Sequence, residues 1–147
     1  MTAPRLRVYS RYSVVAEKLE ALVEKGLATS RMKDLVDILF LSRTHGFDGP
    51  TLVRAIASTF DRRKTPFPAG IPEALGDAFV SSSAKDAQWR AFVRRSRLVD
   101  GVSGLDDVVP VLRDFLLPPL AAARDGARFA PQWIPGKGWR VRGTTSG

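Results

Sequence analysis

The sequence has no cysteine and only one histidine, His45, among its 147 residues. The absence of cysteine excludes disulfides and thiolate metal sites, and a single histidine excludes a site built from several imidazoles. No nucleophile pattern surrounds His45, so contact with the dipole of a helix end is its simplest role. The composition therefore predicts no metal ligands of these kinds and suits a reducing compartment.

Long apolar runs are missing as well. The most apolar stretch, Leu35 to Leu41, is short and contains an aspartate, so it does not reach the length of a membrane span. The first residues, MTAPRLRVYSRYSVV, include basic side chains but no unbroken apolar segment, and so predict no secretory signal. We expect a cytoplasmic protein without membrane contact.

Positive charge, by contrast, is abundant. The chain has 23 Lys and Arg residues against 15 Asp and Glu residues, a formal net charge of +8. Such an excess favours phosphate-rich partners such as RNA, DNA or nucleotides. The alternative is a basic protein whose charge serves solubility alone.

The residue patterns predict a mainly α fold, a helical domain of five or six helices with one N-terminal β-strand. The strand is expected at Arg5–Ser10, where basic and apolar residues alternate. Gly26 ends the first helix, and Pro50 opens the third. Pro118 and Pro119 are expected to stop the last helix, unless it resumes through LAAAR. The helices are expected at about 13–25, 30–44, 50–64, 73–80, 84–98 and 103–118.

We divide the chain into three parts. Residues 1–12 form the strand and its lead-in, residues 13–125 form the helical domain, and residues 126–147 form an irregular arm rich in Pro, Gly and Trp.

One lysine lies where an apolar side chain is expected. On a helical wheel Lys18 falls between Val14 and Leu22, inside the apolar arc of the first helix. Because a buried ammonium without a partner is costly, Lys18 should meet an anionic partner or reach a cleft. The alternative is that its long stem carries the charge to the edge of the core.

Two carboxylates interrupt the next helix. Asp34 and Asp37 lie three residues apart and project from one side of it. They could face Lys18 across the helix–turn–helix and orient it, or they could poise a base or a metal-adjacent group. The structural alternatives are a first-turn dipole contact for Asp34 and a simple surface charge for Asp37. Arg31 and Lys33 flank the pair and could hold phosphates.

A basic stripe is expected in the segment DAQWRAFVRRSRL. Arg90, Arg94 and Arg97 fall along one helix face and could follow an RNA backbone. A solvated charged face explains the same pattern. The tryptophans at positions 89, 133 and 139 are expected to anchor the core or the arm, because their amphipathic rings suit partly buried positions.

The segment VVAEKLEALVEKGLATSRMKDLVDILFL resembles the C-terminal part of the AbiEii/AbiGii nucleotidyltransferase-like toxin family. Members show an Ala-Glu-Lys-Leu helix, which is residues 16–19 here, followed by an Arg-x-Lys-Asp-x-x-Asp-Leu-like segment. QWRAFVRR and FAPQWIPGKGWR are also similar to the helical tail of the family, so the resemblance covers about residues 5–140. The second segment is formed here by Arg31, Lys33, Asp34 and Asp37, with Ile38 where leucine is usual.

The resemblance implies transfer of a nucleoside monophosphate from NTP to an acceptor, with Mg²⁺. Some members act on tRNA and are restrained by a separately encoded antitoxin, in type IV-like toxin–antitoxin or abortive-infection systems. Carried over by position, Lys18 would touch the NTP phosphates, with Arg31 and Lys33 nearby. Asp34 or Asp37 would orient that lysine or support the acceptor.

The sequence departs from the family at one important point. The catalytic sheet of the family, with its Gly turn and Asp-x-Asp metal ligands, precedes the region of resemblance, and no such pattern is found in this chain. We therefore expect the C-terminal half of a nucleotidyltransferase-like fold, with the metal ligands in a missing N-terminal half. The competing interpretations are a non-catalytic RNA- or antitoxin-binding module and a degenerate remnant.

Overall fold

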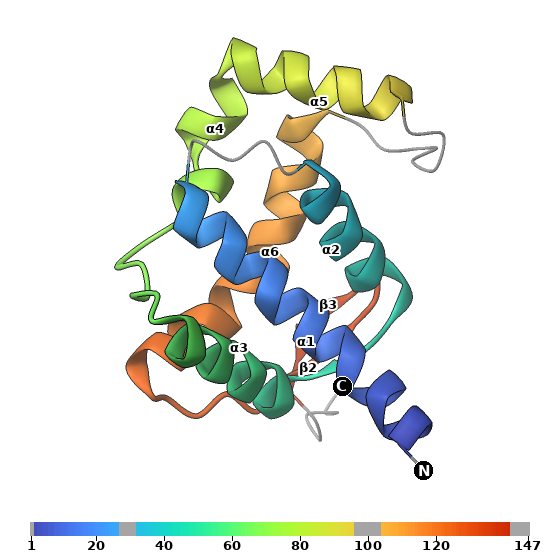
Figure 1. Cartoon of the computed structure of the whole chain (residues 1–147), viewed down its shortest axis with the longest axis vertical. Coiled ribbons are helices and arrows are strands. Elements are labelled where there is room, and N and C mark those ends of the chain that lie inside the picture. Colours follow the sequence, from blue (N-terminus) through green and yellow to red (C-terminus); the bar gives the residue numbers. More distant parts are fainter. Residues whose placement is uncertain (1, 27–31, 96–103, 142–147) are drawn as a thin grey trace.

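The computed structural model describes residues 2–26, 32–95 and 104–141, and this part of the chain is mainly helical (Figure 1). It contains six α-helices, one 3-10 turn and three short strands. The helices are α1 (Thr2–Lys25), α2 (Met32–Thr44), α3 (Gly49–Arg63), α4 (Asp77–Ser81), α5 (Ser83–Arg95) and α6 (Leu105–Asp125). The 3-10 turn is η2 (Glu73–Leu75), and the strands are β1 (Phe47–Asp48), β2 (Gln132–Ile134) and β3 (Gly138–Arg140).

Local signals fix the helix ends much as the sequence predicts. Gly26 follows α1 with φ of +57°, a left-handed conformation that suits glycine. A side chain there would also meet Glu73, because an added Cβ would lie 2.5 Å from Glu73 Oε1. Asp48 caps α3 by accepting a hydrogen bond from Thr51 N at 3.1 Å, and Pro50 lies in the first turn.

The strand predicted at Arg5–Ser10 is wrong, because the structure places these residues in α1. An alternating run of six residues fits a strand or one face of a helix, so periodicity alone does not decide between them. Pro4 lies in the first turn of α1, where its missing N–H costs nothing, and no helix-breaking residue follows before Gly26. The strand of the N-terminal half is instead the two-residue β1, between α2 and α3.

The C-terminal arm forms part of a small antiparallel sheet with the order β1-β2-β3. Phe47 pairs with Trp133, and Trp133 pairs with Trp139. The sequence predicts an irregular arm here. That prediction misses the strands because strands of three residues give almost no periodic signal, and they are joined by a turn in which Gly136 has a φ of +80°. Its position is fixed by Asp48, which accepts a hydrogen bond from Gln132 Nε2 at 2.7 Å.

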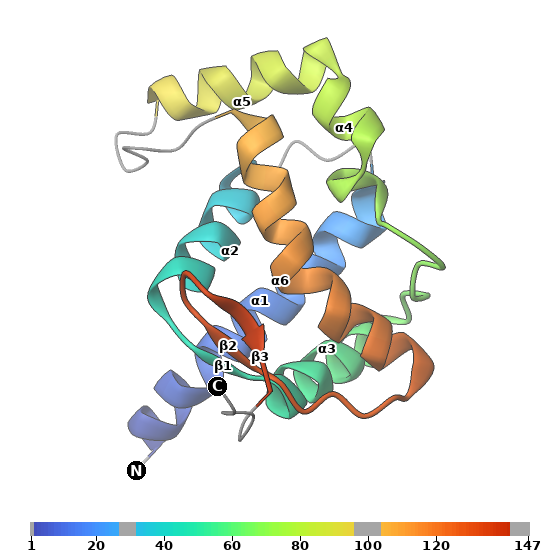
Figure 2. The same ribbon diagram turned by 180° about the vertical axis from the view of Figure 1, so that it is seen from behind.

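Helix α6 runs through the centre of the molecule, behind α1 in Figure 1 and in front of it in Figure 2. Its apolar face carries the buried residues Val109, Leu112, Phe115 and Leu116. The Phe115 ring meets the Trp133 ring at a centroid distance of 4.7 Å and the Phe47 ring at 5.0 Å. The aromatic rings of the small sheet thus close one end of the core formed by α1, α3 and α6.

Helix α6 does not stop at Pro118 and Pro119 but continues to Asp125, as the sequence-based alternative allowed. A proline lacks the N–H that would bond to the carbonyl four residues earlier, so Pro119 leaves the Phe115 carbonyl without its helical donor. Trp139 Nε1 donates to this carbonyl at 3.0 Å. A contact from the arm therefore satisfies the group that the proline leaves open.

Replacing Trp139 with phenylalanine is expected to lower the free energy of unfolding by about 1–2 kcal/mol, because the Phe115 carbonyl loses its donor. Urea unfolding followed by circular dichroism measures the change. In a Pro119→Ala background the restored backbone N–H should reduce the cost of Trp139→Phe. An equal cost in both backgrounds would contradict this account of the contact.

Among the described residues, no helix is both long and apolar enough to cross a lipid bilayer.

Candidate functional site

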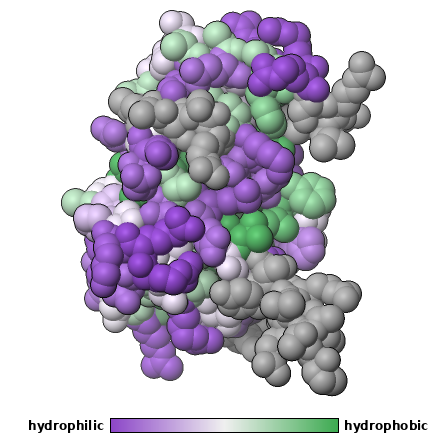
Figure 3. All heavy atoms as spheres, in the orientation of Figure 1, coloured by the Kyte–Doolittle hydropathy of each residue, from purple (hydrophilic) through white to green (hydrophobic). Residues whose placement is uncertain are grey.

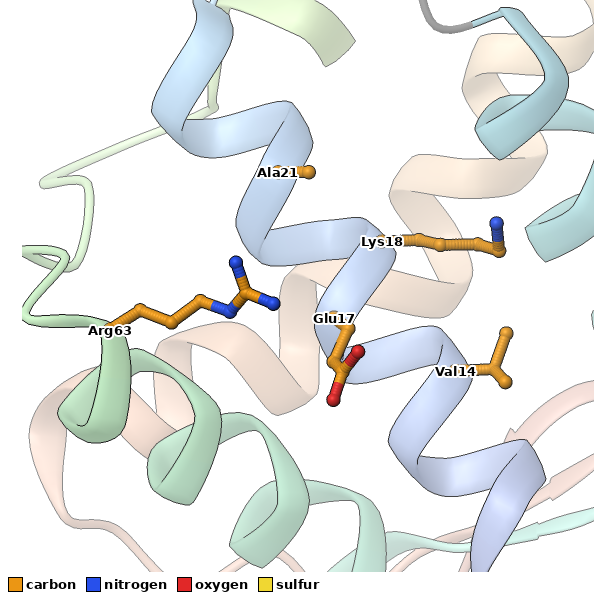
Figure 4. Close-up of a pocket in the computed structure, with 5 residues that line it drawn as sticks. All are labelled: Val14, Glu17, Lys18, Ala21 and Arg63. Atoms are coloured by element: carbon orange, nitrogen blue, oxygen red, sulfur yellow. The ribbon is translucent and has the colours of Figure 1, made fainter.

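Lys18 of α1 lies against two carboxylates of α2. Its Nζ atom is 2.9 Å from Asp34 Oδ1 and 3.1 Å from Asp37 Oδ2. The sequence-based expectation of an anionic partner is therefore confirmed, and the two aspartates share one side of α2 as predicted. Figure 4 shows the Lys18 side chain extending from α1 toward α2.

The two carboxylates differ in their surroundings. The Asp34 side chain is 5% exposed, whereas the Asp37 side chain is 29% exposed and also accepts a hydrogen bond from Lys33 Nζ at 2.8 Å. Lys33 is an exposed neighbour one turn away on α2. We call Lys18, Lys33, Asp34 and Asp37 the Lys18 cluster. Asp34 is its buried member, and its setting goes beyond a simple first-turn dipole contact.

Two members of the cluster, Lys18 and Asp37, have pKa values that are shifted in the direction of their charged forms. Burial lowers the pKa of Lys18, but hydrogen bonds and attraction to Asp34 and Asp37 outweigh burial and hold this pKa above its ordinary value. Burial likewise raises the pKa of Asp37, but the hydrogen bonds from Lys33 and Lys18 outweigh it and hold the pKa below its ordinary value. The surroundings of Lys18 thus favour its charged ammonium form.

A hollow of about 310 Å³ lies beside the cluster on the surface of α1. One side of the hollow is formed by four residues of α1 that share a helix face. The other side is formed by Arg63, the last residue of α3 (Figure 4). The lining residues are Val14, Glu17, Lys18, Ala21 and Arg63. Apolar surface gathers nearby where α1 and α2 meet (Figure 3), and Phe40 of α2 is 60% exposed.

Arg63 is a site residue that sequence reasoning missed. Two arginines at the end of a helix are explained by its dipole, so nothing in the local pattern marks Arg63 as special. Its Nε atom lies 3.7 Å from Oε1 of the buried Glu20, whose Oε2 accepts a hydrogen bond from Thr65 Oγ1 at 2.6 Å. Arg63 can be recognised as a site residue only in the folded chain, where α3 packs against α1 and brings Arg63 beside Glu20.

The basic stripe of α5 lies at the end of the molecule opposite α3 (Figure 1). Arg90 and Arg94 are exposed, and Arg90 pairs with Asp86 at 2.7 Å. Trp89 on the same helix is buried in the core, as expected. The two other predicted site residues, Arg31 and Arg97, lie outside the described residues. The structure thus brings Lys18, Lys33, Asp34 and Asp37 together, and it places Arg90 and Arg94 on a different helix.

The residues of the site do not fit a divalent metal ion. Mg²⁺ prefers oxygen ligands that are free to coordinate it, but the carboxylates of Asp34 and Asp37 contact lysine ammonium groups. Within residues 2–26, 32–95 and 104–141, no three His, Cys, Asp or Glu side chains gather as a metal site would require.

Comparison with known proteins identifies a family. A family model described as the nucleotidyl transferase AbiEii toxin of a type IV toxin–antitoxin system matches residues 1–109. This range contains the whole Lys18 cluster, Arg63 and the α5 arginines. No curated protein and no solved structure matches the chain.

Proposed function

Because that match spans most of its residues, the chain belongs to the AbiEii nucleotidyltransferase toxin family of type IV toxin–antitoxin systems, and we propose that it binds NTP phosphates through Lys18. The proposed reaction is transfer of a nucleoside monophosphate to an RNA acceptor such as tRNA. Membership of the family implies an NTP substrate and a cognate antitoxin. We place this reaction in the cytoplasm, where NTPs and tRNA occur together.

The observation that carries the proposal is a lysine held by two carboxylates beside an open hollow. In nucleotidyl transfer an acceptor hydroxyl oxygen bonds to the α-phosphorus, the bond to the bridging α–β oxygen breaks, and pyrophosphate leaves. Negative charge builds on the phosphate oxygens, and a fixed ammonium stabilises it. Asp34 and Asp37 position Lys18, while Lys33 adds positive charge beside it. Arg31, the other phosphate-binding candidate from the sequence, lies outside the described residues.

Nucleotidyl transfer of this kind uses Mg²⁺ to neutralise the phosphates. Since the described carboxylates do not fit that ion, we propose that its ligands come from a further polypeptide or segment acting with this part of the chain. The proposed role of the described residues is then to bind and orient the nucleotide.

The test is binding of labelled NTP and its transfer to total tRNA, with wild type beside Lys18→Ala. We expect NTP binding that depends on Lys18 and little or no transfer by the chain alone. Labelling of tRNA that Lys18→Ala leaves unchanged would contradict the role given to this lysine.

A second candidate is a non-catalytic RNA- or antitoxin-binding module. The exposed arginines of α5, away from the hollow, favour RNA as its ligand. RNA binding of equal strength with and without NTP would support this candidate over the enzyme part, and a chain that binds neither ligand would be a remnant.

Reversing Arg90 and Arg94 to glutamate is expected to weaken RNA binding and to flatten its salt dependence. Each lost phosphate contact lowers the slope of log affinity against log salt by about one. Filter binding of tRNA across a salt series measures both quantities. The pair Arg128→Glu and Lys137→Glu, at exposed positions near the C-terminal end of the chain, is the charge-matched control. Equal losses in both variants would show that net charge, and not the α5 face, governs binding.

A further inference from the structure

We propose that Arg63 is a second phosphate-binding side chain of this site and holds the polyphosphate chain of the nucleotide from the α3 side. The inference rests on the proposed function, since it concerns the same hollow. Arg63 and Lys18 both line that hollow, Lys18 on the α2 side and Arg63 on the α3 side (Figure 4). Ala21 also lines the hollow, and its small side chain leaves the space open.

The guanidinium of Arg63 has hydrogen-bonding capacity left for a ligand. Its distance of 3.7 Å to Glu20 Oε1 exceeds that of a hydrogen bond, and its side chain is 50% exposed. Among the residues that the structure describes, no oxygen accepts a hydrogen bond from Arg63. By contrast, Lys18 already donates to Asp34 at 2.9 Å.

The Glu20 carboxylate attracts the Arg63 guanidinium but accepts no hydrogen bond from the N–H groups of Arg63. The Glu20 carboxylate is buried and held by the Thr65 hydroxyl, so it offers a fixed negative charge beneath the guanidinium. This charge attracts Arg63 toward α1, where the hollow lies (Figure 4). The terminal nitrogens of its planar fork point toward α1 (Figure 4), and such a fork is suited to bidentate binding of phosphate oxygens.

Glu17, an acidic residue that lines the hollow, forms an ion pair with Arg62. The Glu17 Oε2 atom is 3.3 Å from the Arg62 guanidinium. Arg62 does not line the hollow, so it offsets the charge of Glu17 from outside. An extended polyanion can therefore approach Lys18 and Arg63 without facing an uncompensated carboxylate.

This arrangement favours a chain of phosphates over a single one. The proposal requires a ligand that reaches a cation on each side of the hollow, and a triphosphate is better suited to this than the shorter inorganic phosphate. We therefore expect inorganic tripolyphosphate to bind more tightly than inorganic phosphate. Base recognition plays no part in this difference, so both probes are used without a nucleoside.

Isothermal titration of the full chain with inorganic tripolyphosphate tests the proposal. Arg63→Gln is expected to weaken binding about tenfold, as loss of a partly exposed charged hydrogen-bond donor does. Arg63→Lys should lose less, because it keeps the charge but not the fork. Arg54→Gln is the matched control, because Arg54 is an exposed arginine of the same helix that does not line the hollow, and it should alter the dissociation constant less than about twofold.

The outcomes separate this inference from the proposed function. If Lys18→Gln weakens binding but Arg63→Gln does not, the Lys18 site stands and the role of Arg63 is overturned. Equal losses in Arg54→Gln and Arg63→Gln also overturn it, because they indicate diffuse attraction. If wild type binds tripolyphosphate no better than phosphate and without dependence on Lys18, both proposals fail. Thermal unfolding of each free variant confirms that the fold is retained.

Discussion

Replacing Lys18 with methionine is expected to lower the free energy of unfolding by about 2–3 kcal/mol, because the buried Asp34 carboxylate loses its attraction to the Lys18 ammonium. The side chain of Asp34 is 5% exposed and that of Lys18 is 22% exposed, so water compensates little at the carboxylate. Methionine keeps the length and apolar packing of the lysine stem, so the loss reports the charge. Urea unfolding monitored by circular dichroism measures it.

Lys33→Met is the matched control for this experiment. Lys33 contacts Asp37 at 2.8 Å, but its side chain is 72% exposed, and exposed pairs contribute less than about 1 kcal/mol. Combining Lys18→Met with Asp34→Asn should recover part of the lost stability, because the buried negative charge is then removed as well. Equal losses for Lys18→Met and Lys33→Met would show that burial of Asp34 carries no cost.

The same cluster gives the stability a defined response to acid. The folded-state pKa of Asp37 lies below the unfolded value, so its contribution is present above the unfolded pKa and is lost as the pH falls through the folded one. The pKa of Lys18 is raised, so its contribution is complete below the unfolded pKa and is lost as the pH rises through the folded one. Lys18→Met should therefore flatten the stability profile at both ends of the pH range.

Binding of labelled NTP should fall roughly 10- to 100-fold in Lys18→Ala, because a charge-assisted hydrogen bond to phosphate is lost. Each of the four NTPs is tested by equilibrium dialysis, at a temperature where both proteins are folded. Lys25→Ala is the control, since Lys25 lies at the exposed end of α1 and pairs only loosely with Glu24, at 3.8 Å. Its affinity should change less than about twofold.

Transfer to tRNA completes this second test. Strong labelling by the wild-type chain alone, abolished in Lys18→Ala, would confirm the phosphate role of Lys18 but identify a complete enzyme. The metal carboxylates would then be sought among residues to which we give structural roles, Glu17 and Glu20 included. NTP binding that survives intact in Lys18→Ala would instead remove Lys18 from the site.

Much of the helical framework follows from local sequence. Gly26, Asp48 and Pro50 mark helix ends through φ preference, side-chain capping and a missing N–H, all of which act within one turn. The misplaced charge of Lys18 likewise predicts a partner on the next helix, and Asp34 and Asp37 are at hand within the same helix–turn–helix. The resemblance of this segment to the AbiEii family rests on the same residues.

Features that join distant segments could not be read in this way. The alternation at Arg5–Ser10 suits either a strand or a helix, and only the continuity of α1 in the folded chain decides for the helix. The small sheet needs β1 to meet an arm more than eighty residues away, as the hydrogen bond from Gln132 to Asp48 shows. Such pairings depend on packing, which no local period encodes.

The sequence by itself determined most of the helix positions, the basic charge and the candidates for the lysine–aspartate cluster, because helix periodicity puts Lys18 in the apolar arc of one helix and both aspartates on one side of the next. Only the tertiary structure decided the second wall of the hollow. Arg63 looks like an ordinary helix-end cation until α3 packs on α1 and sets it beside the buried Glu20. The physical reason is that the local sequence explains why an arginine lies at the end of α3, whereas Glu20, which attracts this arginine, lies on α1, another part of the chain.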